Sequence, residues 1–113
     1  MPERVDRRLL EELKLVMQDD YAMILEAYLE DSERQLREML HARQAGDVSR
    51  LCEIAHSLKG ASRNVGALGV AGFCEDLEQR AERGPTSAIR EALALLRKEL
   101  REVREIFLAT LSP

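Results

Sequence analysis

The sequence predicts an all-α fold, a small bundle of amphipathic helices, and three observations support this. Apolar residues recur at spacings of three and four through most of the chain, which is the period of a helix with one buried face. No segment alternates apolar and polar residues as a half-buried strand would. Hydrophobic residues make up 45% of the chain and charged residues 34%, but aromatic residues only 4%, which is typical of a small helical bundle.

Length and charge narrow the class of protein. The 113 residues predict a single domain, residues 1–113, with one hydrophobic core. The 21 acidic residues outnumber the 17 basic ones, and the net charge of −4 argues against nucleic acid as a partner. No apolar run reaches the roughly 20 residues that a membrane span needs. Met1-Pro2-Glu3-Arg4 lacks the apolar core of a signal peptide, so we expect a cytoplasmic protein without a membrane segment.

The first two helices are predicted from their caps and their apolar positions. Asp6 is a plausible N-cap for a first, short helix. Asp19-Asp20 then interrupts the pattern and can cap a second helix from about Tyr21 to about Gln44. Gly46 fits the C-terminal stop of that helix, and Asp47 fits the N-cap of the next. The apolar positions of the two helices are Leu9, Leu10, Leu13, Val16 and Met17, and Ile24, Leu25, Tyr28, Leu29, Leu36, Met39 and Leu40.

A third helix is predicted from about Val48 to about Asn64, with His56 on its solvent side. The apolar positions of this helix fall on one side of the helical wheel and are Leu51, Ile54, Leu58, Ala61 and Val65. His56 points almost directly away from this stripe. Positions three, four and seven apart share a helix face, so Lys59, Gly60 and Arg63 should lie beside the imidazole.

Glycine and proline separate the two remaining helices. Gly66 is predicted to end the third helix, and Gly84-Pro85 is a strong stop and turn after the fourth. Thr86 or Ser87 is expected to cap the last helix. The inward positions of these two helices are Leu68, Val70, Phe73, Cys74, Leu77 and Ala81, and Ile89, Leu93, Leu96, Leu100, Val103 and Phe107. The heptad-like spacing of the last helix can mean a coiled-coil dimer, but in a chain this short it favours packing within the bundle and a monomer.

The residues around His56 suit phosphoryl transfer through histidine. A free imidazole has a pKa of about 6.5, so most of it is the neutral nucleophile at neutral pH. Lys59 supplies a positive charge for the oxygens of a phosphoryl group. A glycine such as Gly60 costs a helix about 1 kcal/mol relative to alanine, and on an exposed face close approach by another molecule is the usual reason for it. No carboxylate or second histidine is placed in the sequence for an obvious acid–base relay, which favours a carrier over a catalyst.

The same segment resembles the family of histidine-containing phosphotransfer (HPt) domains. The matching residues are His56-Ser57-Leu58-Lys59-Gly60 with Ala61, Ser62, Asn64, Val65, Gly66 and Ala67, then Leu68, Cys74 and Leu77-Glu78, and upstream Tyr28-Leu29-Glu30-Asp31-Ser32. The resemblance implies an antiparallel four-helix bundle with an additional short N-terminal helix, which relays phosphate between aspartates of receiver domains. It implies His56 as the phosphoacceptor and Lys59 as the residue that stabilises the phosphoryl group. Gly60 would give the partner access, and Arg63 would have a supporting role. The implied partners are response-regulator receiver domains and hybrid sensor histidine kinases.

Several functional groups are not expected. No Gly-rich phosphate loop is present, so the chain should have no ATP site and no cofactor, and should act as a phosphocarrier rather than as an enzyme. The magnesium that assists such transfers would belong to the receiver partner. Cys52 and Cys74 form no C-x-x-C pair, and we expect both thiols to be reduced. Cys52 lies one turn before His56, but two ligands are too few for a structural zinc site.

Two other functions remain open at this point. The same fold can be the phosphoacceptor module of a chemotaxis-type kinase, although Met1 and the short ends favour a free-standing protein. A receiver domain as phosphate donor favours the relay protein, and a kinase catalytic domain as donor favours the module. The chain can also be a helical adaptor that is never phosphorylated, in which case His56 is replaceable without loss of function.

Overall fold

The computed structural model describes residues 3–112 as five α-helices and one short 3₁₀ turn, with no strand in that range. The elements are α1 (Arg7–Met17), η1 (Gln18–Asp20), α2 (Tyr21–Gln44), α3 (Val48–Asn64), α4 (Leu68–Arg83) and α5 (Thr86–Leu111). The all-α prediction is confirmed. The expectation of a free-standing protein was based on Met1, which lies outside the described residues.

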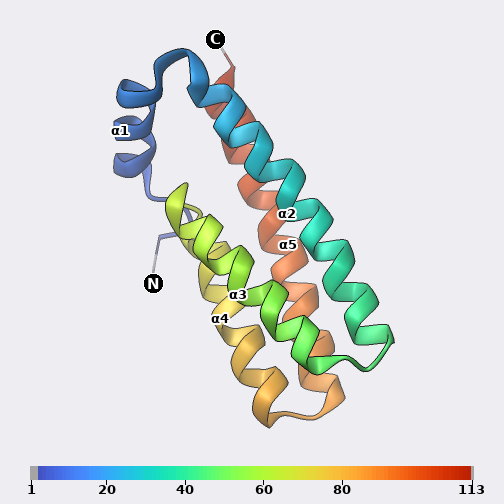
Figure 1. The fold of residues 1–113 in the computed structure, drawn as a ribbon. Helices are drawn as coiled ribbons and strands as arrows, with labels where there is room; N and C mark the ends of the chain where they lie inside the picture. Colours follow the sequence, from blue (N-terminus) through green and yellow to red (C-terminus); the bar gives the residue numbers. More distant parts are fainter. Residues whose placement is uncertain (1–2, 113) are drawn as a thin grey trace.

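Four of the helices form an antiparallel bundle in which each contacts two neighbours (Figure 1). α2 packs against α3 and α5, and α4 also packs against α3 and α5, so the seam between α2 and α5 lies opposite the seam between α3 and α4. α1 lies beside one end of the bundle and contacts η1 and α2. This is the predicted four-helix bundle with an additional short N-terminal helix. Among residues 3–112, no helix has both the length and the apolarity that a membrane crossing requires.

Local signals set several helix boundaries where the sequence predicts them. Asp6 Oδ1 accepts a hydrogen bond from a backbone N–H in the first turn of α1 at 3.1 Å, and Asp47 Oδ1 does the same for α3 at 3.0 Å. Gly46 and Gly66 follow the ends of α2 and α3 with φ of +71° and +76°. Both values lie in the left-handed region that favours glycine, so these residues end their helices cleanly.

Two predicted caps are wrong. The side chain of Asp20 accepts no hydrogen bond from α2, because its backbone is already helical (φ −84°, ψ −8°) and η1 runs directly into α2. Thr86 and Ser87 do not cap α5 either. Pro85 occupies the N-cap position, and its carbonyl accepts two of the N–H groups of the first turn. In both places backbone carbonyl groups before the helix, and not a capping side chain, accept hydrogen bonds from its first N–H groups.

Helix α1 buries less apolar surface than the sequence pattern predicts. Leu10 is its only buried residue, whereas Val16, which was expected on the inner side, is 75% exposed. Leu15 is 76% exposed as well. Because α1 projects beside the bundle and does not pack within it (Figure 1), only a narrow side of this helix meets other residues.

The hydrophobic core lies between α2, α3, α4 and α5. All six predicted inward positions of α5 are buried there. The rings of Tyr28 and Phe107 meet at the core with their centroids 5.9 Å apart. The heptad-like spacing of α5 therefore reflects packing within the bundle, as predicted.

The segment before α1 is fastened to the turn between α3 and α4. The N–H of Asp6 donates to the carbonyl of Gly66 at 2.8 Å, and the N–H of Gly69 donates to the carbonyl of Arg4 at 2.9 Å. The guanidinium of Arg4 also pairs with the buried carboxylate of Glu99 on α5 at 3.0 Å. These contacts tie together the adjoining ends of α3 and α4, the two helices that build the site described next.

Candidate functional site

His56 lies near the middle of α3, and its side chain is 74% exposed. The buried residues of α3 are Leu51, Ile54, Ala55, Leu58 and Ser62, and Val65 in the turn after it is also buried. Ala61 is exposed, which corrects the predicted stripe. Since α3 contacts both α2 and α4, its buried face is wider than the apolar pattern indicates. Ser62 is accommodated there because its Oγ lies 2.7 Å from Tyr28 Oη.

A carboxylate holds one nitrogen of the imidazole. Glu78 Oε1 on α4 lies 3.2 Å from Nδ1 of His56. A carboxylate can only accept a hydrogen bond, so this contact places the ring proton on Nδ1 and the lone pair of neutral imidazole on Nε2. The sequence shows no obvious carboxylate for an acid–base relay with this histidine, and the structure supplies one from the next helix, Glu78 of α4.

Lys59 is not on the outer face, contrary to the sequence prediction. Its side chain is only 11% exposed, and Nζ donates to Glu75 Oε2 at 2.7 Å and to Glu78 Oε2 at 2.6 Å. These two hydrogen bonds raise the pKa of Lys59, and the bond from Lys59 lowers the pKa of Glu75. One oxygen of Glu78 thus faces the imidazole while the other faces the ammonium group.

The four side chains form a small charge network with a net negative charge. Two carboxylates, Glu75 and Glu78, face one ammonium group while His56 is neutral. The positive charge of Lys59 is therefore already engaged, and a phosphoryl group on His56 would compete for it with Glu75 and Glu78. Glu75 is 46% exposed and Glu78 is 17% exposed, so water can solvate Glu75 more readily once it is released.

Gly60 and Arg63 lie on the exposed side of α3, as predicted. A Cβ atom added at Gly60 would meet nothing within 4 Å, so packing within the chain does not require a glycine there. Arg63 makes no ion pair within residues 3–112. The structure therefore brings Lys59 close to the carboxylate that holds His56, and leaves Gly60 and Arg63 open to a partner.

The other candidates from the sequence lie outside this network. His41 is exposed on α2 and has none of these partners. Cys52 is half-buried, and burial raises the pKa of its thiol. Cys74 is buried, and burial raises the pKa of its thiol to about 12. In the described part of the chain, no three His, Cys, Asp or Glu side chains are arranged to hold a metal ion.

Sequence reasoning missed Glu75 and Glu78 as members of the site. Two carboxylates three positions apart lie on one face of a helix, which is a signal the sequence does contain. Leu77-Glu78 also belongs to the segment in which the sequence resembles HPt domains. What the sequence does not contain is the direction in which that face of α4 points.

The sequence and the fold of the chain are both similar to those of known proteins. The model of the Hpt domain family matches residues 23–106, which include the whole network around His56. The crystal structure of histidine-containing phosphotransfer protein B (HptB) from Pseudomonas aeruginosa is similar, with 37% sequence identity and a TM-score of 0.90; the match covers 97% of this chain and 96% of that one. A rice protein assigned to the histidine-containing phosphotransfer proteins has the same fold, with a TM-score of 0.85 at 21% identity over 94% of this chain and 78% of that one. No curated protein matches the chain.

Proposed function

Because this chain belongs to the Hpt domain family, its function is histidine phosphotransfer in a phosphorelay, and we propose that His56 is the residue that carries the phosphoryl group. One observation supports the choice of residue above all others. The imidazole is exposed, and its Nδ1 is held by Glu78 at 3.2 Å. Nε2 makes no hydrogen bond within residues 3–112, so it is the ring atom that a partner can reach.

The proposed step is a direct exchange of one bond for another. The lone pair of His56 Nε2 attacks the phosphorus of a phosphoaspartate on a receiver domain, the new N–P bond forms, and the aspartyl O–P bond breaks. The aspartate leaves as a carboxylate, and the proton on Nδ1 stays where it is. The ring gains positive charge in this step, and the carboxylate of Glu78 stabilises that charge. The reverse step, with the aspartate of a second receiver as the nucleophile, passes the phosphoryl group on.

Lys59 is proposed to stabilise the phosphoryl group by exchanging partners. In the unphosphorylated chain its ammonium group donates to Glu75 and Glu78. A phosphoryl group on Nε2 offers new acceptor oxygens with more negative charge than one carboxylate. Glu75, the more exposed of the two carboxylates, is the partner that Lys59 would release. Glu78 keeps its contact with the imidazole throughout.

Gly60 is proposed to give the partner access to the helix backbone beside His56. The two residues are four positions apart and therefore share a helix face. Transfer requires the two reacting atoms to approach closely in line, which brings the loops of the partner against this face. Arg63, one turn further along, is exposed, offers a positive charge to an acidic partner and is proposed to support docking.

Hpt domains interact with receiver domains in phosphorelays. For this chain we propose hybrid sensor histidine kinases and response regulators as the proteins that carry those receivers. We further propose that the chain acts as a monomeric phosphocarrier without an ATP site of its own. The expected cytoplasmic location stays a prediction.

The test of this function uses purified proteins. The full chain is incubated with a radiolabelled phosphorylated receiver domain, and label is followed on the parent, on His56→Gln and on His41→Gln. The parent and His41→Gln should accept label that is lost in acid, and His56→Gln should accept none. A kinase catalytic domain with ATP serves as the second donor. Label that arrives only from this kinase, and never from receivers, would favour the chemotaxis-type module.

A further inference from the structure

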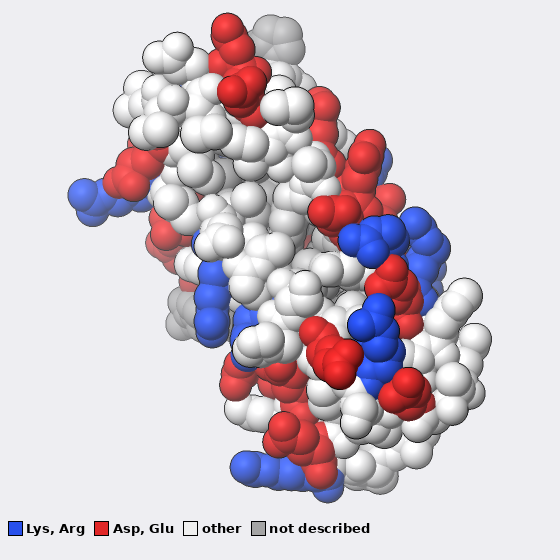
Figure 2. Space-filling model, viewed as in Figure 1, with Lys and Arg blue, Asp and Glu red and all other residues white. Residues whose placement is uncertain are grey.

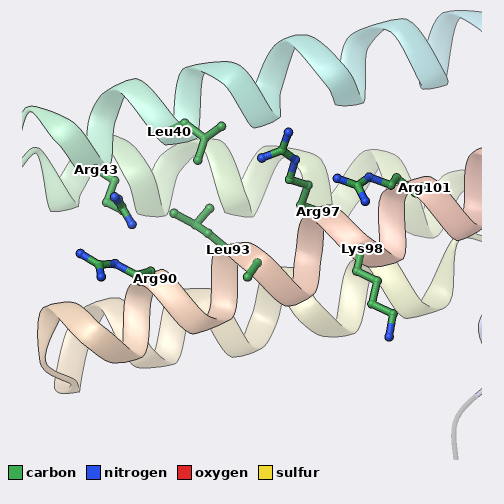
Figure 3. A pocket seen from close by; sticks show the side chains of 8 residues that line it. Leu40, Arg43, Arg90, Leu93, Arg97, Lys98 and Arg101 are labelled. Atoms are coloured by element: carbon green, nitrogen blue, oxygen red, sulfur yellow. The ribbon is translucent and has the colours of Figure 1, made fainter.

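A positively charged groove runs between α2 and α5 (Figure 3). It has a volume of about 310 Å³ and is lined by Leu40, Arg43, Arg90, Leu93, Ala94, Arg97, Lys98 and Arg101. The four arginines extend over the space between the two helices, whereas Lys98 points away from α2 at the rim (Figure 3). Leu40 and Leu93 lie between the arginines and give the groove an apolar floor.

None of these five cationic side chains forms an ion pair with residues 3–112, whereas Arg34, Arg80 and Arg104 all do. Figure 2 shows acidic and basic side chains next to one another at several places on the face turned to the viewer. The groove departs from that arrangement. With five of the 17 basic residues placed here, 12 remain against the 21 acidic residues of the chain. Like charges placed together repel, so this cluster lacks a stabilising role within the chain and suits an anionic partner.

The groove faces away from His56. α2 and α5 form its walls, and the seam between them is opposite the seam of α3 and α4, which holds His56 and Glu78. In Figure 3, α3 and α4 accordingly lie behind the two helices that line the groove. A molecule bound in the groove would leave the imidazole of His56 uncovered. Such a molecule can therefore stay bound during phosphoryl transfer.

We propose that this groove binds an acidic helical segment of a partner protein, with carboxylates on the arginines and apolar side chains on the leucine floor. Arg90, Arg97 and Arg101 are seven and four positions apart on α5, so they form a row along one face of that helix. A helix with acidic residues at the same spacing, and a leucine between them, is complementary to that row and to the partly exposed Leu40 of α2. This proposal does not depend on phosphorylation of His56.

Two other anionic partners fit the groove less well. Single-stranded nucleic acid binds where bases stack on aromatic rings, and no aromatic side chain lines this groove. An anionic membrane binds helices that present large apolar side chains beside the cations. The exposed large apolar side chains among the described residues lie outside the groove. The row of arginines and the apolar surface of Leu40 beside it favour a helix that lies along the groove, with its side chains directed into it, over both.

The binding experiment uses the full chain and a fluorescent helical peptide of about four turns. Its glutamates have the spacing of the arginine row, with leucine between them, and a control peptide has glutamine at every glutamate. Fluorescence anisotropy should show saturable binding of the acidic peptide that weakens with added salt, and no binding of the control. Arg97→Glu combined with Arg101→Glu should weaken binding at least about tenfold. Arg7→Glu combined with Arg83→Glu, which makes the same change in net charge outside the groove, should leave it nearly unchanged.

A milder variant, a folding check and alternative ligands complete the binding experiment. Arg97→Gln combined with Arg101→Gln is a milder variant that should also weaken binding, and thermal unfolding checks that all variants are folded. Phosphorylation of the parent at saturating peptide should proceed as without it. Equal affinity in the groove variants and the parent would overturn the proposal. So would groove-dependent binding of phosphatidylserine vesicles or of a single-stranded oligonucleotide without binding of the peptide. Peptide that blocks phosphorylation would overturn the placement of the two surfaces on opposite faces.

Discussion

Nδ1 of His56 lies 3.2 Å from Oε1 of Glu78, a residue of the neighbouring helix. This contact fixes which ring nitrogen carries the proton, and so which one is free to react. The second oxygen of the same carboxylate accepts a hydrogen bond from Lys59 at 2.6 Å. The nucleophile and the cation of the site are therefore positioned by one side chain of α4.

Glu78→Gln should slow phosphoryl transfer while leaving the fold intact. The amide can accept from Nδ1 or donate to it, so the ring loses its preference for one tautomer, and the charge that stabilises the phosphorylated ring is gone. In metal sites, losing a carboxylate that orients a histidine typically costs about 10- to 100-fold, and we expect a loss of the same order here. Rapid-quench transfer rates measure this, with Glu105→Gln, at an exposed glutamate of α5, a helix that does not contact α3, as the control. A transfer rate equal to that of the parent would show that Glu78 does not position the ring.

Lys59→Ala should slow transfer, as the sequence alone suggests, and should also lower the melting temperature. The substitution leaves Glu75 and Glu78 close together without their shared cation. Lys59→Met, which keeps the alkyl chain, should be destabilised as well, and Glu75→Gln combined with Lys59→Ala should recover part of the loss. Thermal unfolding of these variants makes the comparison. An unchanged melting temperature in Lys59→Ala would mean that the charge network contributes nothing to stability.

The hydrogen bond between Lys59 and Glu75 also predicts how stability depends on pH. The hydrogen bond from Lys59 lowers the pKa of Glu75 below its ordinary value of 4.5. A carboxyl group whose pKa falls on folding stabilises the fold above its unfolded pKa, and this is lost as pH falls through the folded pKa. Glu75→Gln should therefore melt below the parent at neutral pH and level with it well below pH 4.5. If the melting temperatures of Glu75→Gln and the parent differ as much in acid as at neutral pH, the difference does not come from the ionised carboxylate of Glu75.

Gly60→Ala and Gly60→Gln should separate stability from function. A Cβ at this position meets nothing within 4 Å, so both variants should melt level with the parent or higher, with a gain of up to about 1 kcal/mol from better helix propensity. Transfer should be impaired in order of side-chain size, because the partner must approach this face. Melting temperature and transfer rate are measured on the same samples. Fast transfer by Gly60→Gln would show that the glycine is not there for access.

Gly69→Ala and Gly72→Ala, both on α4, should have opposite effects on stability. A Cβ at Gly69 would collide with the carboxylate of Glu99, which is buried and bound to Arg4, so we expect a loss of about 1–3 kcal/mol. A Cβ at Gly72 meets nothing within 4 Å, so Gly72→Ala should be neutral or stabilising by up to about 1 kcal/mol. Chemical denaturation gives both values. A stabilised Gly69→Ala would contradict the packing described around Glu99.

Much of the fold follows from local signals in the sequence, because caps and helix stops act over a few residues. Asp47 and Gly46 are such signals, and they place the ends of α2 and α3 where the structure has them. The exposure of His56 also follows from periodicity alone, since it requires only the phase of one helix. Thr86 and Ser87 show the limit of this reasoning, because backbone contacts with Pro85 replaced the expected cap.

The pairing within the site could not be predicted in this way. Whether Glu78 faces His56 depends on how α4 is rotated against α3, and many residues spread along both helices determine that rotation together. Ala61 and Ser62 show the same limit, because α3 has neighbours on two sides and the phase of its apolar stripe records only part of its buried face. The cationic groove likewise needs Arg43 of α2 to meet the row on α5.

The most direct test of the account is NMR of the chain with isotope-labelled histidine, before and after phosphorylation by a receiver domain. Long-range proton–nitrogen correlations identify the tautomer of each ring and the nitrogen that carries phosphorus. We expect His56 to have its proton on Nδ1 before the reaction and its phosphoryl group on Nε2 afterwards, with His41 unchanged. Phosphorus on Nδ1 of His56, or on His41, would contradict the proposed role of Glu78 or of His56.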